Sequence, residues 1–278
     1  TNLKIIFECD HCEVRPISGT NANEAVFSRF VGPGDVVMVN STPGGGHISH
    51  HRRGSLGKFT HNIIDFPVTP DGYHIDLEKA AYLIEKTRPK LIVAGKSLFL
   101  FPEPVAELAE VCRHTKTLIV YDAAHVLGLI AGRRFQSPLK EGAWLMTAST
   151  HKTFFGSQRG VVLSNMEEEP WRKIDRGAFP GSSSNHHLDT LAQMALCTYE
   201  MMDFGESYAE NTIRNAKALA LALHRLGFDV QGKDFGYTES HQVAVNVKPN
   251  GGGEKVSRTL EANDIILNMN MLPHEPLS

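Results

Sequence analysis

The 278-residue chain has an ordinary globular composition, with 41% hydrophobic and 21% charged residues. Its formal net charge of -3 and its lack of a long apolar run give no indication of a nucleic-acid or membrane partner, and four cysteines are too few for a disulfide framework. We therefore expect a cytoplasmic protein with one large domain and part of a second.

Near the start of the chain, Cys9 and Cys12 form a C-x-x-C pair with His11 between them. A zinc site would need a second pair of ligands at similar spacing, and none is obvious. Redox pairs of this kind usually begin a helix after a strand, whereas this pair precedes a strand-like stretch at residues 13–17. We interpret both cysteines as structural residues.

Short apolar, β-branched runs alternate with amphipathic helical patterns over the first 165 residues. The runs predict strands at residues 36–39, 63–66, 91–94, 118–121, 144–147 and 160–163, and the patterns predict helices at residues 22–31, 76–86 and 104–113. Strands that are covered on both faces appear as continuous apolar runs, so the chain predicts an α/β fold with a mostly parallel sheet.

The pattern changes after Asn165. A polar segment at residues 181–187 precedes a long helix at 188–202, which we expect Gly205 to end before a second helix at 208–226. Strands at 228–230, 243–247 and 265–267 and a helix at 255–261 then predict an incomplete α+β unit. We place a domain boundary at Gly205, which gives a large domain at 1–204 and the start of a smaller one at 205–278.

Four segments place small or reactive residues near the ends of predicted strands, where open α/β sheets bind ligands. The first, residues 18–23, has the sequence S-G-T-N-A-N, with Gly19 and Thr20 at the expected start of a helix. Backbone N–H groups there suit a phosphate. The segment matches neither a Walker loop nor G-x-G-x-x-G. Taken alone, it favours a plain helix cap by Ser18 or Thr20.

A second segment, residues 44–51, has three glycines followed by His47, His50 and His51. The glycines allow the backbone to approach a ligand closely, and an imidazole can stack on an aromatic ring. A metal-binding histidine cluster is the rival interpretation. We rank it lower, because three histidines within five residues give poor tetrahedral geometry without a nearby carboxylate.

Asp122 and Lys152 follow two of the predicted strands. Asp122, three residues before His125, fits a buried ion pair, half of a metal site, or the carboxylate that ionises the pyridine nitrogen of pyridoxal phosphate (PLP). Lys152 has Thr150, His151 and Thr153 around it. It is either an ordinary solvated lysine or a lysine whose pKa is lowered for covalent catalysis.

In their order along the chain, these segments resemble the serine hydroxymethyltransferase family of fold-type-I PLP enzymes over nearly the whole length. Residues 18–23 resemble the family's S-G-S-x-A-N phosphate loop, which implies that Gly19 and Thr20 hold the phosphate. Residues 45–47 resemble its G-G-H, which implies that His47 stacks on the cofactor ring. Residues 122–125 resemble its D-x-A-H, which implies that Asp122 bonds the ring nitrogen and that His125 orders the polar edge.

The later motifs complete the resemblance. Residues 150–153 resemble T-H-K-T, which implies that Lys152 binds the cofactor covalently and that Thr150 and His151 are secondary contacts. Ser97 stands where a family serine approaches the 3′-oxygen of the cofactor. Residues 179–181 resemble the F-P-G loop, which implies that Gly181 reaches the phosphate of a neighbouring subunit. Residues 268–270, N-M-N, resemble the family's N-K-N.

Some positions depart from the family pattern. Residues 182–187, S-S-S-N-H-H, replace the usual G-G-Q-G-G-P, Thr42 and Pro43 replace a Leu-Ala that helps to hold folate, and Lys96 replaces an apolar residue. These departures indicate a divergent branch. The family's N-terminal segment and its carboxylate-binding arginine would lie before Thr1 and beyond Ser278, so we expect the chain to be a central section.

The resemblance implies a PLP-dependent hydroxymethyltransferase that cleaves serine or another β-hydroxy amino acid by a retro-aldol reaction and transfers a one-carbon unit. Lys152, Asp122, His47 and His125 are the implied catalytic residues. A reduced pterin, tetrahydrofolate or a relative, is the implied co-substrate, and a homodimer or dimer of dimers the implied assembly. Two alternatives stay open: a folate-independent aldolase or transaldolase, and a catalytically silent PLP-fold subunit.

Overall fold

The computed structural model, which describes residues 1–273, has a seven-stranded sheet as its main structural element. Its strands lie in the order β1-β7-β6-β5-β4-β2-β3. They are β1 (His11–Glu13), β2 (Val37–Val39), β3 (Ile63–Asp65), β4 (Leu91–Ala94), β5 (Leu118–Asp122), β6 (Leu145–His151) and β7 (Phe155–Ser164). The strands from β2 to β6 are parallel, and β7 and β1 are antiparallel additions at one edge. The mostly parallel α/β prediction is confirmed.

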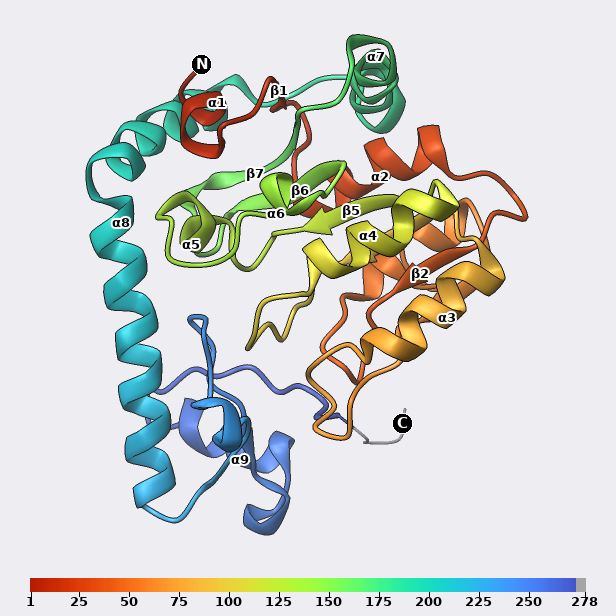
Figure 1. Cartoon of the computed structure of the whole chain (residues 1–278). Helices are drawn as coiled ribbons and strands as arrows, with labels where there is room; N and C mark the ends of the chain where they lie inside the picture. Colours follow the sequence, from red (N-terminus) through yellow and green to blue (C-terminus); the bar gives the residue numbers. More distant parts are fainter. Residues whose placement is uncertain (274–278) are drawn as a thin grey trace.

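Helices cover both faces of this sheet (Figure 1). They are α1 (Asn2–Phe7), α2 (Gly19–Phe30), α3 (Leu77–Thr87), α4 (Val105–Thr115), α5 (Leu127–Ala131), α6 (Pro138–Glu141), α7 (Glu168–Arg176) and the long α8 (Leu188–Arg225). Asp76 caps α3 by accepting a hydrogen bond from the Lys79 N–H. Such caps offset the unpaired N–H groups at a helix start. The three predicted helices before residue 165 thus form within a few residues of their expected bounds.

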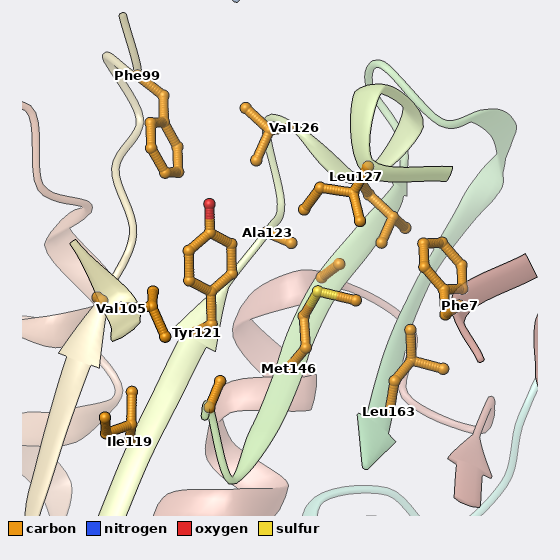
Figure 2. Packing of buried hydrophobic residues seen from close by; sticks show 14 of the residues in the cluster. Phe7, Phe99, Val105, Ile119, Tyr121, Ala123, Val126, Leu127, Met146 and Leu163 are labelled. Atoms are coloured by element: carbon orange, nitrogen blue, oxygen red, sulfur yellow. The ribbon is translucent and has the colours of Figure 1, made fainter. Parts of the chain in front are cut away.

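Alternate residues of the central strands enter two separate cores. In β4, Ile92 and Ala94 pack in the core on the α3, α4 and α5 side, whereas Leu91 and Val93 pack in the core on the α2 and α7 side. Figure 2 shows part of the first core, where Phe99, Tyr121 and Met146 lie among aliphatic side chains. Burial on both faces explains the continuous apolar run of β4, because successive side chains of a strand point to opposite faces.

The expected strand at residues 13–17 lies earlier in the chain, as β1. Residues 11–13 pair antiparallel with β7, and the pairing stops before Pro16, which has no N–H to donate to a strand partner. The strand β7, which lies between β1 and β6, is longer than expected because residues 155–159 continue its pairing with β6 as far as His151.

The expected helix break at Gly205 is wrong, because α8 is continuous from Leu188 to Arg225. Gly205 is buried where α8 crosses the end of α5, and a Cβ on Gly132 would lie 2.2 Å from the Gly205 carbonyl oxygen. Tertiary packing between two glycines therefore overrides the low helix propensity of Gly205. The domain boundary proposed there would fall inside a helix, and it stays a prediction.

Below the sheet in Figure 1, α8 reaches a small unit made by the described residues that follow it, up to residue 273. It contains the short antiparallel strands β8 (Asp229–Val230) and β9 (Val245–Asn246), together with α9 (Gly253–Glu261). The strand expected at residues 265–267 is wrong: these residues form no strand, and Ile266 is 84% exposed. None of the helices within residues 1–273 has the length and apolar character needed to cross a membrane.

Candidate active site

A pocket of about 190 Å³ opens at the carboxyl ends of β5 and β6. Its walls come from the start of α2, the loop after β2, the loop after β4, and the segments after β5 and β6. The lining residues are Ser18, Gly19, Thr20, Asn23, His47, Ser49, His50, Lys96, Asp122, Ala124, His125, Ser149, His151, Lys152 and Gln158. The fold thus gathers seven of the predicted site residues, from four separate segments, at the edge where parallel sheets bind ligands.

The start of α2 gives the pocket an anion-binding wall. Ser18 caps the helix by accepting a hydrogen bond from the Asn21 N–H at 3.1 Å. The first N–H groups of a helix, here those of Gly19 and Thr20, have no acceptor within the helix. A Cβ on Gly19 would lie 3.3 Å from the backbone nitrogen of Ser149, so the helix end lies directly against the end of β6. Both interpretations of this segment are therefore compatible: Ser18 caps α2, and Gly19 and Thr20 can bind a phosphate.

Asp122 is the charged residue at the base of the pocket. It is buried, and its Oδ2 accepts hydrogen bonds from Asn23 Nδ2 at 2.7 Å and from His50 Nε2 at 2.8 Å. Its Oδ1 accepts from the Ala124 N–H at 2.9 Å. Burial alone would raise the pKa of this carboxyl, but the bonds and charge from His50, then Asn23 and Ala124, lower the pKa below its usual range. Asp122 is therefore ionised at neutral pH.

Lys152 lines the same pocket, just after β6. Its Nζ donates to the Ser149 Oγ at 2.8 Å. Partial burial lowers the pKa of Lys152, and the negative charge of Asp122 opposes this shift only in part. A lowered pKa increases the fraction of neutral amine, which is the form that attacks a carbonyl carbon.

His47 and His125 line the pocket as neutral imidazoles. Burial lowers the pKa of His47, and its Nδ1 accepts a hydrogen bond from the Ser49 N–H at 3.2 Å. Burial, with Lys152 and His241 nearby, lowers the pKa of His125 to about 3. The His47 ring lies 6.1 Å from the ring of His50, which in turn hydrogen-bonds Asp122. Within residues 1–273, no three His, Cys, Asp or Glu side chains are arranged to hold a metal ion.

Lys96, a second lysine in the pocket wall, is held by a buried ion pair. Its Nζ lies 2.7 Å from Glu103 Oε1, and it also donates to the Tyr73 carbonyl oxygen. Both side chains of the pair are at least 96% buried. Lys96 is bound to the Glu103 carboxylate, whereas Lys152 Nζ donates to a serine hydroxyl and has a lowered pKa, so Lys152 is the better nucleophile of the two.

Three predicted residues lie outside the pocket wall. The Thr150 side chain is buried and donates to the backbone carbonyls of Ser157 and Arg159, so the structure does not bring its hydroxyl to the pocket. Ser97 pairs through its backbone N–H with Gly45, next to Lys96. Gly181 lies in the turn η3 (Gly177–Ser182), outside the pocket, and its contact with a neighbouring subunit stays a prediction.

Three residues without a predicted role also contact the site: Asn23 and His50, which bind Asp122, and Gln242, which binds beside His125. Asn23 and His50 lay within segments singled out in the sequence, and a buried carboxylate in need of donors was the signal that could have found them. Gln242 comes from the small unit, and no pattern in the sequence pointed to it. Cys9 is buried outside this site, and burial raises its thiol pKa to about 11.

The pocket has the chemistry to hold an aldehyde that carries a basic aromatic ring and an anionic group. Lys152 can attack the aldehyde, the ionised Asp122 can hold a proton on a ring nitrogen, and the start of α2 can bind the anion. The residues present therefore fit PLP.

Comparison with known proteins gives consistent relatives. The family model described as serine hydroxymethyltransferase matches residues 2–278. The chain is 49% identical to the serine hydroxymethyltransferase of Archaeoglobus fulgidus, covering 98% of this chain and 62% of that protein. It is 50% identical to the one of Pyrococcus abyssi, covering 98% of this chain and 65% of that protein.

A solved structure has the same fold. The L-threonine transaldolase of Pseudomonas fluorescens, in its internal aldimine state, is 29% identical and matches with a TM-score of 0.90, covering 99% of this chain and 62% of that one. This likeness confirms the expected fold-type-I α/β architecture. The chain spans less than two thirds of the length of these curated relatives and of this structure.

Proposed function

Because the chain belongs to the serine hydroxymethyltransferase family, we propose that it binds PLP and cleaves serine, or another β-hydroxy amino acid, between Cα and Cβ. The one-carbon unit so released would pass to a reduced pterin, tetrahydrofolate or a relative. The observation that carries this proposal is the placement of Lys152, Asp122 and the start of α2 around one pocket.

Each wall of the pocket has a part in holding the cofactor. Lys152 would bond to its aldehyde carbon, the N–H groups of Gly19 and Thr20 would bind its phosphate, and His47 would lie against its ring. Asp122, held ionised by His50 and Asn23, would keep a proton on the ring nitrogen. When bound, PLP supplies an electron sink for negative charge that develops at Cα of an amino acid.

The protein's own groups would control protons and water in this pocket. Lys152, once free of the cofactor, is an amine with a lowered pKa that can accept or return a proton close to Cα. His125 stays neutral at physiological pH, so it can hydrogen-bond a substrate carboxylate without adding a second full charge beside Lys152. His151, on the rim, is exposed and serves as a secondary contact.

A folate-independent aldolase or transaldolase is the second candidate, favoured by the TM-score of 0.90 with the L-threonine transaldolase. The departures at Thr42, Pro43 and residues 182–187 are compatible with it. The two candidates differ in their co-substrate. Cleavage of serine that depends on added tetrahydrofolate supports the first, and exchange of aldehydes on threonine or glycine without pterin supports the second.

A test of the shared part of the proposal is cofactor binding followed by amino-acid binding. We expect the protein to take up one PLP per chain, to become coloured, and to change its visible spectrum when glycine or serine is added. A Lys152→Ala variant should lose the first spectrum, while Lys140→Ala, which removes an exposed lysine, should keep it. A colourless protein would contradict the proposal and favour a catalytically silent subunit.

We further propose a homodimer, or a dimer of dimers, with composite sites. Phe179, two residues before Gly181, is 38% exposed and Leu188, at the start of α8, is 69% exposed, which fits a segment that packs against a second copy. Sedimentation should give a dimer at micromolar concentration, and mixing Lys152→Ala subunits with subunits altered at residues 182–187 should restore activity. A cytoplasmic location fits the four free cysteines.

A further inference from the structure

Gln242 links the small unit to the wall of the pocket. It lies in the loop between β8 and β9, and its side-chain amide enters the space between the loop after β4 and His125. Its Oε1 accepts a hydrogen bond from the Phe99 N–H, and its Nε2 donates to the Ser97 carbonyl oxygen at 2.8 Å.

These two backbone partners fix the orientation of the amide. A backbone N–H can only donate and a backbone carbonyl can only accept, so the oxygen of Gln242 must face Phe99 and its NH₂ group must face Ser97. The usual ambiguity between the oxygen and nitrogen of a glutamine side chain is therefore removed.

The same NH₂ group lies 3.4 Å from the Nδ1 of His125. A neutral imidazole has one nitrogen that donates and one that accepts. Since the amide nitrogen only donates, Nδ1 must be the accepting nitrogen, and the proton of His125 must lie on Nε2. We propose that Gln242 is a positioning residue that fixes His125 as the tautomer with its proton on Nε2.

The surroundings of His125 keep this tautomer neutral. Its ring is mostly buried, and it faces Lys152, His241, Asp122 and His47. Burial, Lys152 and the other imidazoles all oppose protonation, and Asp122 alone favours it, so the pKa is lowered to about 3. The ring of His241 lies nearly parallel to that of His125 at 6.3 Å between centroids, and burial lowers its pKa to about 4.

The consequence for the reaction rests on the proposed function. With Nδ1 occupied by Gln242, the Nε2–H is the polar group that His125 can offer to a ligand in the pocket. His125 would therefore donate to an oxygen of the cofactor or of the amino-acid carboxylate, and it would not act as the general base. Gln242 would also tie the position of the small unit to this donor.

The test is ¹⁵N NMR of histidine-labelled protein without added cofactor, because the two tautomers of imidazole give different ring ¹⁵N shifts. Because a free neutral histidine side chain already favours the proton on Nε2, the comparison is with a variant: we expect the ratio of the Nε2–H to the Nδ1–H form of His125 to be roughly five-fold higher in the unaltered protein than in Gln242→Leu, the preference that one hydrogen bond supplies. His125→Asn identifies the signals of this residue.

Three variants separate positioning from packing. Gln242→Glu replaces the donor with a carboxylate oxygen, so the proton of His125 should move to Nδ1 and the His125 pKa should rise. Gln242→Leu should give a mixture of both tautomers. Gln231→Leu, a matched change in the same unit that removes a bond to Tyr73 instead, should leave the His125 signals unchanged.

Two results would overturn the inference: an Nδ1–H form in the unaltered protein, or the same tautomer in Gln242→Glu as in the unaltered protein. Either would leave cofactor uptake on Lys152 intact, so it would not touch the proposed function. Conversely, a protein that never binds PLP could still show the Gln242-dependent tautomer. Circular dichroism of each variant checks that it remains folded.

Discussion

Replacing Asp122 by asparagine removes the charge at the base of the pocket and almost nothing of the side-chain volume. The carboxylate accepts three hydrogen bonds, from Asn23, His50 and the Ala124 N–H, on two different oxygens. An amide has one oxygen. If that oxygen faces Asn23 and His50, the new NH₂ group meets the Ala124 N–H, and if it is turned round, the NH₂ group meets the Asn23 donor.

Either orientation leaves at least one buried donor unpaired. An unsatisfied buried group costs about 1–3 kcal/mol of folding free energy, so we expect a fall of a few degrees in Tm. The effect on the reaction should be larger. An amide cannot hold the ring-nitrogen proton as a carboxylate does, and loss of one fixed electrostatic partner in a protected site typically lowers kcat by about 10²–10³-fold.

The assay is the rate of cleavage of a β-hydroxy amino acid at saturating PLP, measured together with Tm. Asp203→Asn, an exposed carboxylate on α8, is the matched control and should change neither quantity. Asp122→Asn activity within a few-fold of the unaltered protein, with PLP still bound, would refute the assigned role of Asp122.

Three further changes have defined expected outcomes. The folded-state pKa of His241 is lowered to about 4 from an unfolded value near 6.5, so its contribution to stability is present above pH ~6.5 and is lost as pH falls toward 4. The free energy of unfolding in urea should therefore fall between pH 7 and pH 5 by about 2 kcal/mol less in His241→Asn than in the unaltered protein. An equal fall in both proteins would contradict this. Lys96→Met leaves the Glu103 carboxylate buried without its charged partner and should lower the free energy of unfolding by about 3–5 kcal/mol. The double variant Lys96→Met with Glu103→Leu should recover most of this stability, and no recovery would show that the ion pair is not the cause. Gly132→Ala places a Cβ 2.2 Å from the Gly205 carbonyl oxygen and should lower the free energy of unfolding by about 1–3 kcal/mol. In Gly32→Ala the nearest neighbour of the new Cβ would lie at 3.7 Å, so this control should change the free energy of unfolding little. Equal effects of the two substitutions would refute the close α5–α8 packing.

The local sequence pattern correctly predicted elements whose side chains all have the same environment, such as a strand that is buried on both faces. The strand β4 is buried on both faces, and its predicted bounds, residues 91–94, are correct because a short continuous apolar run is typical of a buried strand. The break at Gly205 was expected from propensity, which costs a helix only ~1 kcal/mol at one glycine. Packing against Gly132, 73 residues earlier, outweighs that cost, and no local pattern reports it. Residues 265–267 look like a strand because they are apolar, but they lack strand partners within the described residues.

The same distinction applies to the site: local motifs identified some of its residues, and others join it only through the fold. The motifs identified Asp122 and Lys152 because each is a reactive residue next to a predicted strand end. They did not identify how Asp122 is kept ionised, since its partners Asn23 and His50 are 99 and 72 residues away in sequence and meet it only in the fold. Gln242 belongs to none of the predicted motifs, and it contacts His125 from the separate small unit of the chain.

The most direct test of the central claim is reductive labelling of the PLP-loaded protein with borohydride, followed by peptide mapping. Among the described residues, the pocket wall contains two lysines, and the structure distinguishes them: Lys96 is bound to Glu103, while Lys152 has a lowered pKa and donates to the Ser149 hydroxyl. We predict that the cofactor is fixed on Lys152 in the peptide that contains residues 150–153, and that Lys152→Ala abolishes labelling. An adduct on Lys96, or on any other lysine, would contradict the account.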